Sequence, residues 1–174
     1  MNTQADANST AIPVKLRNMT SVYLTNRNGI LCLYRIGSRV ASNKYVGSAG
    51  GHFEPSELND PKACVLREME EELGLTEADV VGLRLRYITY RLKNGEIRQN
   101  YYYFAVLKED KELTSNEGNL RWVSYDEVPQ LDMPVSAKQM ILHFLEVGRF
   151  CDTLYAGITE ESGTRFVPLT EFEG

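Results

Sequence analysis

Two Asn-Gly dipeptides, at positions 28–29 and 94–95, constrain the fold of this chain more than any other local feature. Each one separates two runs that are rich in β-branched and aromatic residues. Asn-Gly between such runs is the strongest short-range signal for a β-hairpin, because both residues tolerate the positive φ angles of a tight turn. The sequence therefore predicts two antiparallel hairpins, with strands at residues 20–25 and 30–35, and at residues 83–92 and 97–107.

Between the two hairpins we expect a helix that has sequence signals at both ends. Asp60 is a preferred N-cap residue, Pro61 has the fixed φ angle that suits a first helical position, and Gly74 is typical of the residue just after a helix. These signals predict a helix from Pro61 to Leu73. Downstream, the sequence predicts a strand at residues 121–124, a helix at 135–147, and a last hairpin with strands at 153–159 and 164–169.

Length, charge and cysteine use indicate the class of protein. The 174 residues fit one domain, and a net charge of −5 provides no overall positive field for duplex nucleic acid. The three cysteines form no C-x-x-C pair, which indicates free thiols in a reducing compartment. The polar N-terminus has no apolar signal segment, and no apolar run is long enough to span a bilayer. We therefore expect a cytoplasmic protein with no membrane partner, and a flexible N-terminal arm at residues 1–17.

The helix at residues 61–73 carries three glutamates on one side, Glu68, Glu71 and Glu72. Glutamates three or four positions apart have Cβ atoms about 5 to 6 Å apart, so they can share one ligand. The more common explanation of such a run is a solvated helix face. If the carboxylates were partly enclosed, their mutual repulsion would favour a hard cation such as Mg²⁺ or Mn²⁺, which also bridges to substrate phosphates.

The segment that includes this helix resembles the Nudix box. Gly51, five residues and Glu57 precede the run from Arg67 to Leu75, which fits the family pattern R-E-U-x-E-E-x-G-U, with Met69 taken as the aliphatic U. Two departures stand out. Nine residues rather than seven separate Glu57 from Arg67, and Ser48-Ala49 replaces the Leu-Pro or Phe-Pro common before the double glycine. We place the two extra residues in the loop at 58–59. The one question that this leaves open is whether the side chain of Glu57 can still reach Arg67.

The resemblance implies a fold of the α/β (α+β) class, a Nudix-type α/β/α sandwich with a mixed sheet. It assigns residues 18–148 to a Nudix hydrolase domain and residues 149–174 to a C-terminal β-hairpin extension of the same domain. If that hairpin has open edge strands, the chain could form a homodimer through it.

The resemblance also implies a set of site residues. The implied metal ligands are the carbonyl of Gly50 and the carboxylates of Glu68, Glu71, Glu72 and Glu117, with Mg²⁺ as cofactor and Mn²⁺ as the alternative. The implied catalytic residues are Glu57, Arg67, Glu71 and Glu117, with Arg67 orienting the carboxylates and either Glu71 or Glu117 as general base. The implied substrate-binding residues are Arg35 and Gly51. A solvated turn explains Glu117 equally well, and a surface residue of an edge strand would explain Arg35.

The activity that the resemblance implies is Mg²⁺-dependent hydrolysis of a diphosphate linkage in a nucleoside diphosphate-X substrate, a small-molecule nucleotide. The run from Gly50 to Leu75 is most similar to that of bacterial 8-oxo-dGTP diphosphatase-like members, so hydrolysis of 8-oxo-dGTP to the monophosphate and pyrophosphate is our leading hypothesis. The alternatives are a nucleotide sugar or dinucleoside polyphosphate as substrate, or a non-hydrolytic Nudix-fold module that senses a nucleotide or binds a partner. The intact box glutamates argue against the module.

Overall fold

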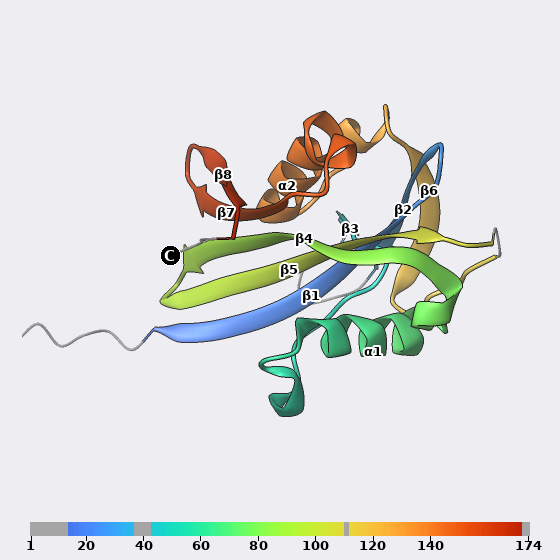
Figure 1. The fold of residues 1–174 in the computed structure, drawn as a ribbon, viewed down its shortest axis with the longest axis horizontal. Coiled ribbons are helices and arrows are strands. Elements are labelled where there is room, and N and C mark those ends of the chain that lie inside the picture. The colour runs from blue at the N-terminus through green and yellow to red at the C-terminus, as the bar shows by residue number, and fades with distance from the viewer. Residues whose placement is uncertain (1–13, 37–42, 110–111, 172–174) are drawn as a thin grey trace, which may run out of the picture.

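The structure, a computed structural model, describes residues 14–36, 43–109 and 112–171. Within these residues eight strands form one mixed sheet, with one α-helix on each face (Figure 1). The strands are β1 (Lys15–Thr25), β2 (Gly29–Arg35), β3 (Tyr45–Val46), β4 (Val80–Lys93), β5 (Glu96–Leu107), β6 (Gly118–Ser124), β7 (Leu154–Glu160) and β8 (Gly163–Leu169). The helices are α1 (Pro61–Leu73) and α2 (Val135–Glu146), with 3₁₀ helices at Pro55–Glu57, Glu77–Asp79, Val128–Gln130 and Gly148–Phe150.

The sheet is mixed because parallel pairings join its hairpins. Strands β1 and β2, β4 and β5, and β7 and β8 are antiparallel neighbours, whereas β1 pairs with β5, and β4 with β7, in parallel. The strand order is β3-β2-β1-β5-β4-β7-β8, and β6 pairs with β2. The predicted α/β (α+β) class and the α/β/α sandwich are therefore confirmed.

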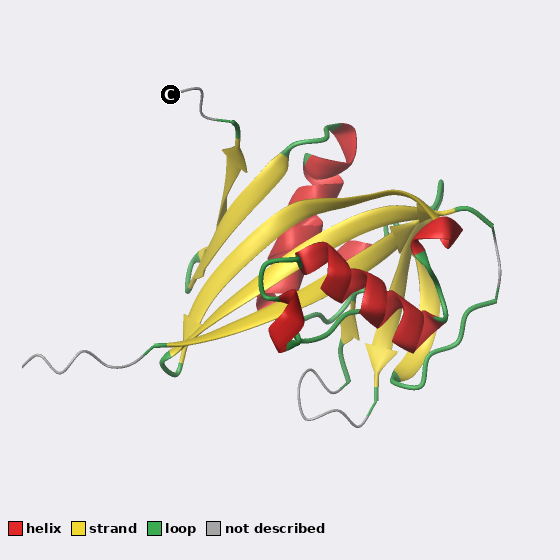
Figure 2. Ribbon diagram, turned by 60° about the horizontal axis from the view of Figure 1, so that its bottom comes forward, coloured by secondary structure: helices red, strands yellow, loops and turns green. Residues whose placement is uncertain are grey.

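Each helix closes a separate apolar core against its own face of the sheet. Successive side chains of a strand point to opposite faces, so the two cores alternate along β1. Val22 packs with Val65 and Met69 under α1, whereas Tyr23 packs under α2, where the rings of Phe104 and Phe144 stack 3.9 Å apart. Figure 2 shows α1 in front of the sheet and α2 behind it.

The ends of α1 are fixed by the residues that the sequence indicated. Asp60 accepts a hydrogen bond from the backbone N–H of Ala63 at 3.0 Å, which satisfies one of the free donors of the first turn. Gly74 has a left-handed φ of 64°, and its N–H donates to the carbonyl of Glu70 at 2.9 Å. These caps set the register of the helix, and with it the direction in which its glutamates point.

The predicted hairpins and helices are confirmed, but two segments differ from expectation. β1 begins at Lys15, so residues 15–17, which we predicted as part of the flexible arm, belong to a strand that pairs with β5. The arm prediction failed there because this pairing joins segments about 80 residues apart, which no local signal reveals. Residues 1–13 lie outside the described residues. The short strand β3 was not predicted, and it pairs with β2.

The C-terminal hairpin continues the sheet. β7 lies beside β4, and β8 forms the outer edge of the sheet. Homodimerisation through this edge stays a prediction. The buried side chain of Arg86 ties the segment before β7 to β4 by donating to the carbonyls of Gly148, at 2.8 Å, Cys151 and Thr153. Among the described residues no helix is both long enough and apolar enough to cross a membrane. Cys32, Cys64 and Cys151 are free, as predicted.

Candidate active site

Two adjacent glycines bring a loop against both β1 and α1. Gly50 has a φ of 152°, and a Cβ atom there would lie 2.3 Å from the backbone oxygen of Thr20. A Cβ atom on Gly51 would lie 2.4 Å from Oε1 of Glu68. The loop is held in place by backbone hydrogen bonds from Thr20 N–H to the carbonyl of Gly51, and from Val22 N–H to that of Ala49, both at 2.9 Å. A side chain at position 50 would block this approach, whereas a side chain at position 51 would displace the carboxylate of Glu68.

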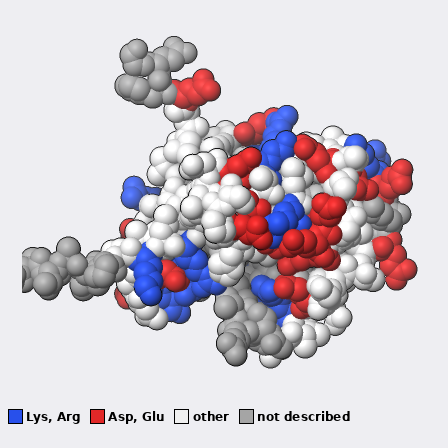
Figure 3. Space-filling view, turned by 90° about the horizontal axis from the view of Figure 1, so that it is seen from below, with Lys and Arg blue, Asp and Glu red and all other residues white. Residues whose placement is uncertain are grey.

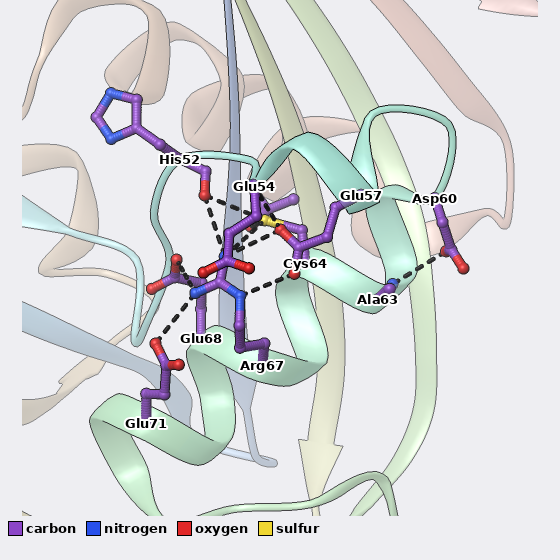
Figure 4. Close-up of polar contacts among 10 residues, drawn as sticks. His52, Glu54, Glu57, Asp60, Ala63, Cys64, Arg67, Glu68 and Glu71 are labelled. Atoms are coloured by element: carbon purple, nitrogen blue, oxygen red, sulfur yellow. Dashed lines mark hydrogen bonds and ion pairs between the residues drawn. The ribbon is translucent and has the colours of Figure 1, made fainter.

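Arg67 is the centre of the polar network on α1, as Figure 4 shows. It donates through Nε and Nη2 to both carboxylate oxygens of Glu57, at 2.8 and 3.0 Å. Its Nη1 donates to Glu68 at 2.8 Å and to Glu71 at 3.0 Å, and its Nη2 donates to the carbonyl of His52 at 3.1 Å. A planar guanidinium with fixed donors therefore orients three carboxylates and the glycine loop together.

Glu57 has a different environment from the other glutamates of the site. Glu57 is 6% exposed, and its carboxylate accepts hydrogen bonds from Arg67 and from the backbone N–H of Glu54. The hydrogen bonds from Arg67 lower the pKa of the Glu57 carboxyl from its ordinary 4.5 to about 2. Glu57 is therefore ionised at neutral pH and anchors Arg67, despite the two extra residues that separate it from the helix.

Glu72 and Glu68 carry negative charge that the surrounding protein does not fully balance. Burial, together with the nearby carboxylates of Glu117 and Glu68, raises the pKa of Glu72 to about 7, although the N–H of Gly50 donates to it at 3.0 Å. Burial also raises the pKa of Glu68, against the lowering effect of Arg67. Glu117 is ion-paired with Arg35. Such raised pKa values mark clustered acids that a cation would stabilise.

Glu68, Glu72 and Glu117 face a cavity of about 490 Å³ beside the glycine loop. Figure 3, which views the α1 side of the molecule, shows acidic side chains gathered around a few basic ones. Most of the predicted site residues line this cavity: Arg35, Gly50, Gly51, Arg67, Glu68, Glu72 and Glu117. Glu57 lies behind Arg67, and the side chain of Glu71 is 59% exposed and held on Arg67. Neither of these two lines the cavity.

The donor chemistry of the cavity fits a hard divalent cation. Carboxylate and carbonyl oxygens are the ligands that Mg²⁺ prefers, and no cysteine or histidine side chain competes with them at the glycine loop except the neighbouring His52. As they stand, no three acidic, histidine or cysteine side chains of the described segments are arranged to hold a metal ion. Arg67, Gly50 and Arg35 each hold one carboxylate oxygen, on Glu68, Glu72 and Glu117 respectively, so an ion would bind through the second oxygen of each carboxylate.

A second cavity, of about 140 Å³, adjoins the first on the α2 side of the sheet. The two share Arg17, Arg35, Gly50, Glu72 and Glu117 among their lining residues. Sequence reasoning did not identify most of the residues that line this second cavity, among them Arg91, Arg98 and Asn100. It had placed Arg17 in the arm. Tyr102, which is part of the core under α2, lines this cavity as well.

Comparison with known proteins agrees with this geometry. A family model described as the NUDIX domain matches residues 15–144. Three similar solved structures are a MutT protein from Bacillus halodurans, a C. elegans Ap4A hydrolase and a NUDIX hydrolase from Nitrosomonas europaea.

The three structures resemble this chain in fold at low sequence identity. The B. halodurans protein is 23% identical with a TM-score of 0.60, over 86% of this chain and 97% of that one. The C. elegans enzyme is 14% identical with a TM-score of 0.60, over 79% and 100%. The N. europaea protein is 14% identical with a TM-score of 0.62, over 83% and 78%. Because the family model spans most of the sequence, the chain belongs to the Nudix family of hydrolases.

Proposed function

We propose that this protein is a Mg²⁺-dependent hydrolase of a diphosphate linkage in a nucleoside diphosphate-X substrate. The leading candidate is 8-oxo-dGTP, cleaved to the monophosphate and pyrophosphate. The observation that carries the proposal is the group of Glu68, Glu72 and Glu117 along one cavity, where burial and mutual repulsion raise the pKa of Glu72 to about 7. A cation that relieves this repulsion would also attract the phosphates of a nucleotide.

The residues that we propose to hold the ion are Glu68, Glu71, Glu72, Glu117 and the carbonyl of Gly50. Glu68 and Glu72 come first, because they are the two α1 glutamates that line the cavity. When bound there, Mg²⁺ would neutralise the substrate phosphates while water attacks phosphorus, and Mn²⁺ would serve the same role.

The protein's own side chains position the reaction. Arg67 fixes Glu68 through a 2.8 Å hydrogen bond and is itself anchored by Glu57. Arg35 supplies a cationic group for a substrate phosphate, and its buried Nε has no hydrogen-bond partner among the described residues. Of our two candidates for the general base, Glu117 fits better than Glu71, because it lines the cavity where the water must lie.

The identity of the nucleobase rests on the motif resemblance. The similar structures are MutT and Ap4A proteins by name, but at 14–23% identity they support the fold and no particular substrate. The substrate panel therefore contains 8-oxo-dGTP, dGTP, ADP-ribose, dinucleoside polyphosphates and nucleotide sugars. Hydrolysis is measured with Mg²⁺, with Mn²⁺ and with EDTA, and product analysis locates the broken bond.

Glu72→Gln tests the role of the acid cluster. We expect it to lower kcat by at least about 100-fold and to leave thermal unfolding near that of the wild type, because the amide keeps the shape but loses the charge. The matched control is Glu70→Gln on the same helix, since Glu70 is exposed and does not line the cavity. Unchanged kcat in Glu72→Gln would remove this glutamate from the mechanism. Hydrolysis of no panel member with either metal would leave the binding-module alternative.

A further inference from the structure

Three arginines form a row across three adjacent strands. Arg17 of β1 is the register partner of Arg98 of β5, and Arg98 is the register partner of Arg91 of β4. Register partners on neighbouring strands point to the same face of a sheet. The side chains of Arg17, Arg91 and Arg98, which we call the arginine row, line the smaller cavity on the α2 side.

The acidic side chains paired with the arginine row do not balance its three positive charges. Within the described segments Glu96 is its ion-pair partner, 2.8 Å from Nε of Arg98 and 3.8 Å from Nη1 of Arg17. Arg91 forms no ion pair there, and its buried Nε has no hydrogen-bond partner. Like charges directly opposite one another destabilise a sheet, so the row indicates a function that outweighs this cost.

The wall of the cavity also holds an unused hydrogen-bond donor. The side chain of Tyr23 is fully buried and lines the cavity, and its hydroxyl has no partner among the described residues. Buried hydroxyl groups without partners are rare in proteins, because losing water without gaining a hydrogen bond is unfavourable. A ligand oxygen in the cavity would satisfy this hydroxyl.

The cavity is small, and it shares lining residues with the proposed catalytic cavity. Its volume of about 140 Å³ is below the roughly 300 Å³ at which pockets begin to enclose a whole drug-sized molecule. It therefore suits one compact group at the end of a substrate. The two glutamates that line it, Glu72 and Glu117, belong to its catalytic end, where we propose that a cation takes up their charge. Because Glu96 is the one acidic partner of the arginine row among the described residues, the row keeps a net positive charge for an anion.

We propose that the arginine row binds a phosphate on the end group of the substrate, separate from the diphosphate that is cleaved. The preferred substrates are then nucleoside diphosphate-X compounds that carry a further phosphate outside the cleaved diphosphate, and such compounds would replace 8-oxo-dGTP as the leading candidate. Arginine is suited to this role because its planar guanidinium binds phosphate oxygens through two parallel hydrogen bonds. The inference rests on the proposed hydrolase function, and its test separates the two.

The test uses pairs of compounds that differ by one phosphate. NADP⁺ is compared with NAD⁺, coenzyme A with dephospho-coenzyme A, and 8-oxo-dGTP with 8-oxo-dGDP. For the first two pairs we expect kcat/KM to be at least tenfold higher for the phosphorylated member. In Arg91→Gln the ratio of the two kcat/KM values should be close to one. The kcat/KM for the member without the extra phosphate should stay within twofold of the wild-type value. The matched control is Arg84→Gln on the same strand, since Arg84 is exposed and outside this cavity.

Two further measurements separate a binding role from a structural role and from failure of the hydrolase. Thermal unfolding of Arg91→Gln should occur at the wild-type temperature or above, because the change removes a like charge. Calorimetric titration with NADP⁺ and NAD⁺ in Ca²⁺ should show tighter binding of NADP⁺ that Arg91→Gln abolishes. Such binding without hydrolysis of any compound would refute the hydrolase proposal alone.

Several outcomes would overturn the inference. The first is equal kcat/KM, with equal or undetectable binding, for the two members of the NADP⁺ and coenzyme A pairs. The second and third are a preference for the phosphorylated member that survives Arg91→Gln, or one that Arg84→Gln also abolishes. The fourth is a clear loss of thermal stability in Arg91→Gln. A preference confined to the 8-oxo-dGTP pair would also overturn it, because the arginine row would then recognise the third phosphate of a nucleotide chain.

Discussion

Replacing Gly51 with alanine would place a methyl group where the carboxylate of Glu68 now lies. The new Cβ atom would be 2.4 Å from Oε1 and 2.6 Å from Cδ of Glu68, closer than such atoms can approach. The backbone can accept alanine, because Gly51 is not among the residues with positive φ. The contacted atoms form the free end of a side chain, so Glu68 moves and the loop does not.

The size of the effect follows from the distance that the carboxylate must move. Ordinary Cβ contacts begin at 3.4 Å, so Oε1 has to shift by about 1 Å. A displacement of that size in a catalytic group costs on the order of 100-fold in rate. Stability should change by less than about 1 kcal/mol, because the loss of the Arg67 hydrogen bond is offset by the lower entropy of the unfolded chain with alanine.

The assay compares kcat/KM with thermal unfolding in Gly51→Ala and in Gly50→Ala. The second variant is the control, because its Cβ atom would lie 2.3 Å from the backbone oxygen of Thr20 at a φ of 152°, so the backbone itself must shift. Gly50→Ala should therefore unfold at a clearly lower temperature, whereas Gly51→Ala should lose activity alone. Wild-type kcat/KM in Gly51→Ala, or a matching loss of stability in both variants, would refute the reasoning.

Three predictions concern stability. Arg86→Met should destabilise the protein by about 3 kcal/mol in urea unfolding, because it leaves carbonyls of Gly148 and Cys151 without their buried donor; an unchanged midpoint would contradict this. Phe144→Ala should lower the free energy of unfolding by about 3 to 5 kcal/mol, because it removes the ring stacked on Phe104. A loss below about 1 kcal/mol would contradict this, since neighbouring side chains would then have filled the space. The pKa of Glu57 is about 2 in the folded protein against an ordinary 4.5, so its stabilisation is complete above pH 4.5 and lost as the pH falls toward 2. The stability difference between wild type and Glu57→Gln should therefore shrink across that window, and a constant difference would contradict this assignment.

Local chemistry made most of the fold predictable. The Asn94-Gly95 turn, the Asp60-Pro61 start and the Gly74 stop each act within a few residues and appear in the structure at their expected positions. The hairpin at Asn28-Gly29 also forms, but neither of these residues has a positive φ and Gly29 already begins β2, so its turn differs from the expected one. The parallel pairing of β1 with β5 depends on segments about 80 residues apart, and no local pattern encodes it. This explains why Arg17 was assigned to an arm.

Part of the arginine row was within reach of the sequence. A hairpin whose turn is centred on residues 94 and 95 pairs residue 93 with 96 and residue 91 with 98, as the structure shows. Two arginines directly opposite each other are unfavourable in an antiparallel pair, so that register alone marks an unusual position. The third arginine and the helix that encloses the cavity depend on tertiary structure, so the cavity itself was not predictable from the hairpin.

The two extra residues between Glu57 and Arg67 show how the motif tolerates an insertion. Glu57 lies in the 3₁₀ helix Pro55–Glu57, where its carboxylate accepts from the N–H of Glu54 at 2.9 Å and its carbonyl accepts from the N–H of Asp60 at 2.8 Å. Leu58 is 55% exposed, so the added chain lies at the surface. The short helix positions Glu57 and the Asp60 cap sets the register of Arg67. The bidentate contact therefore depends on these two local structures and does not depend on the number of residues between them.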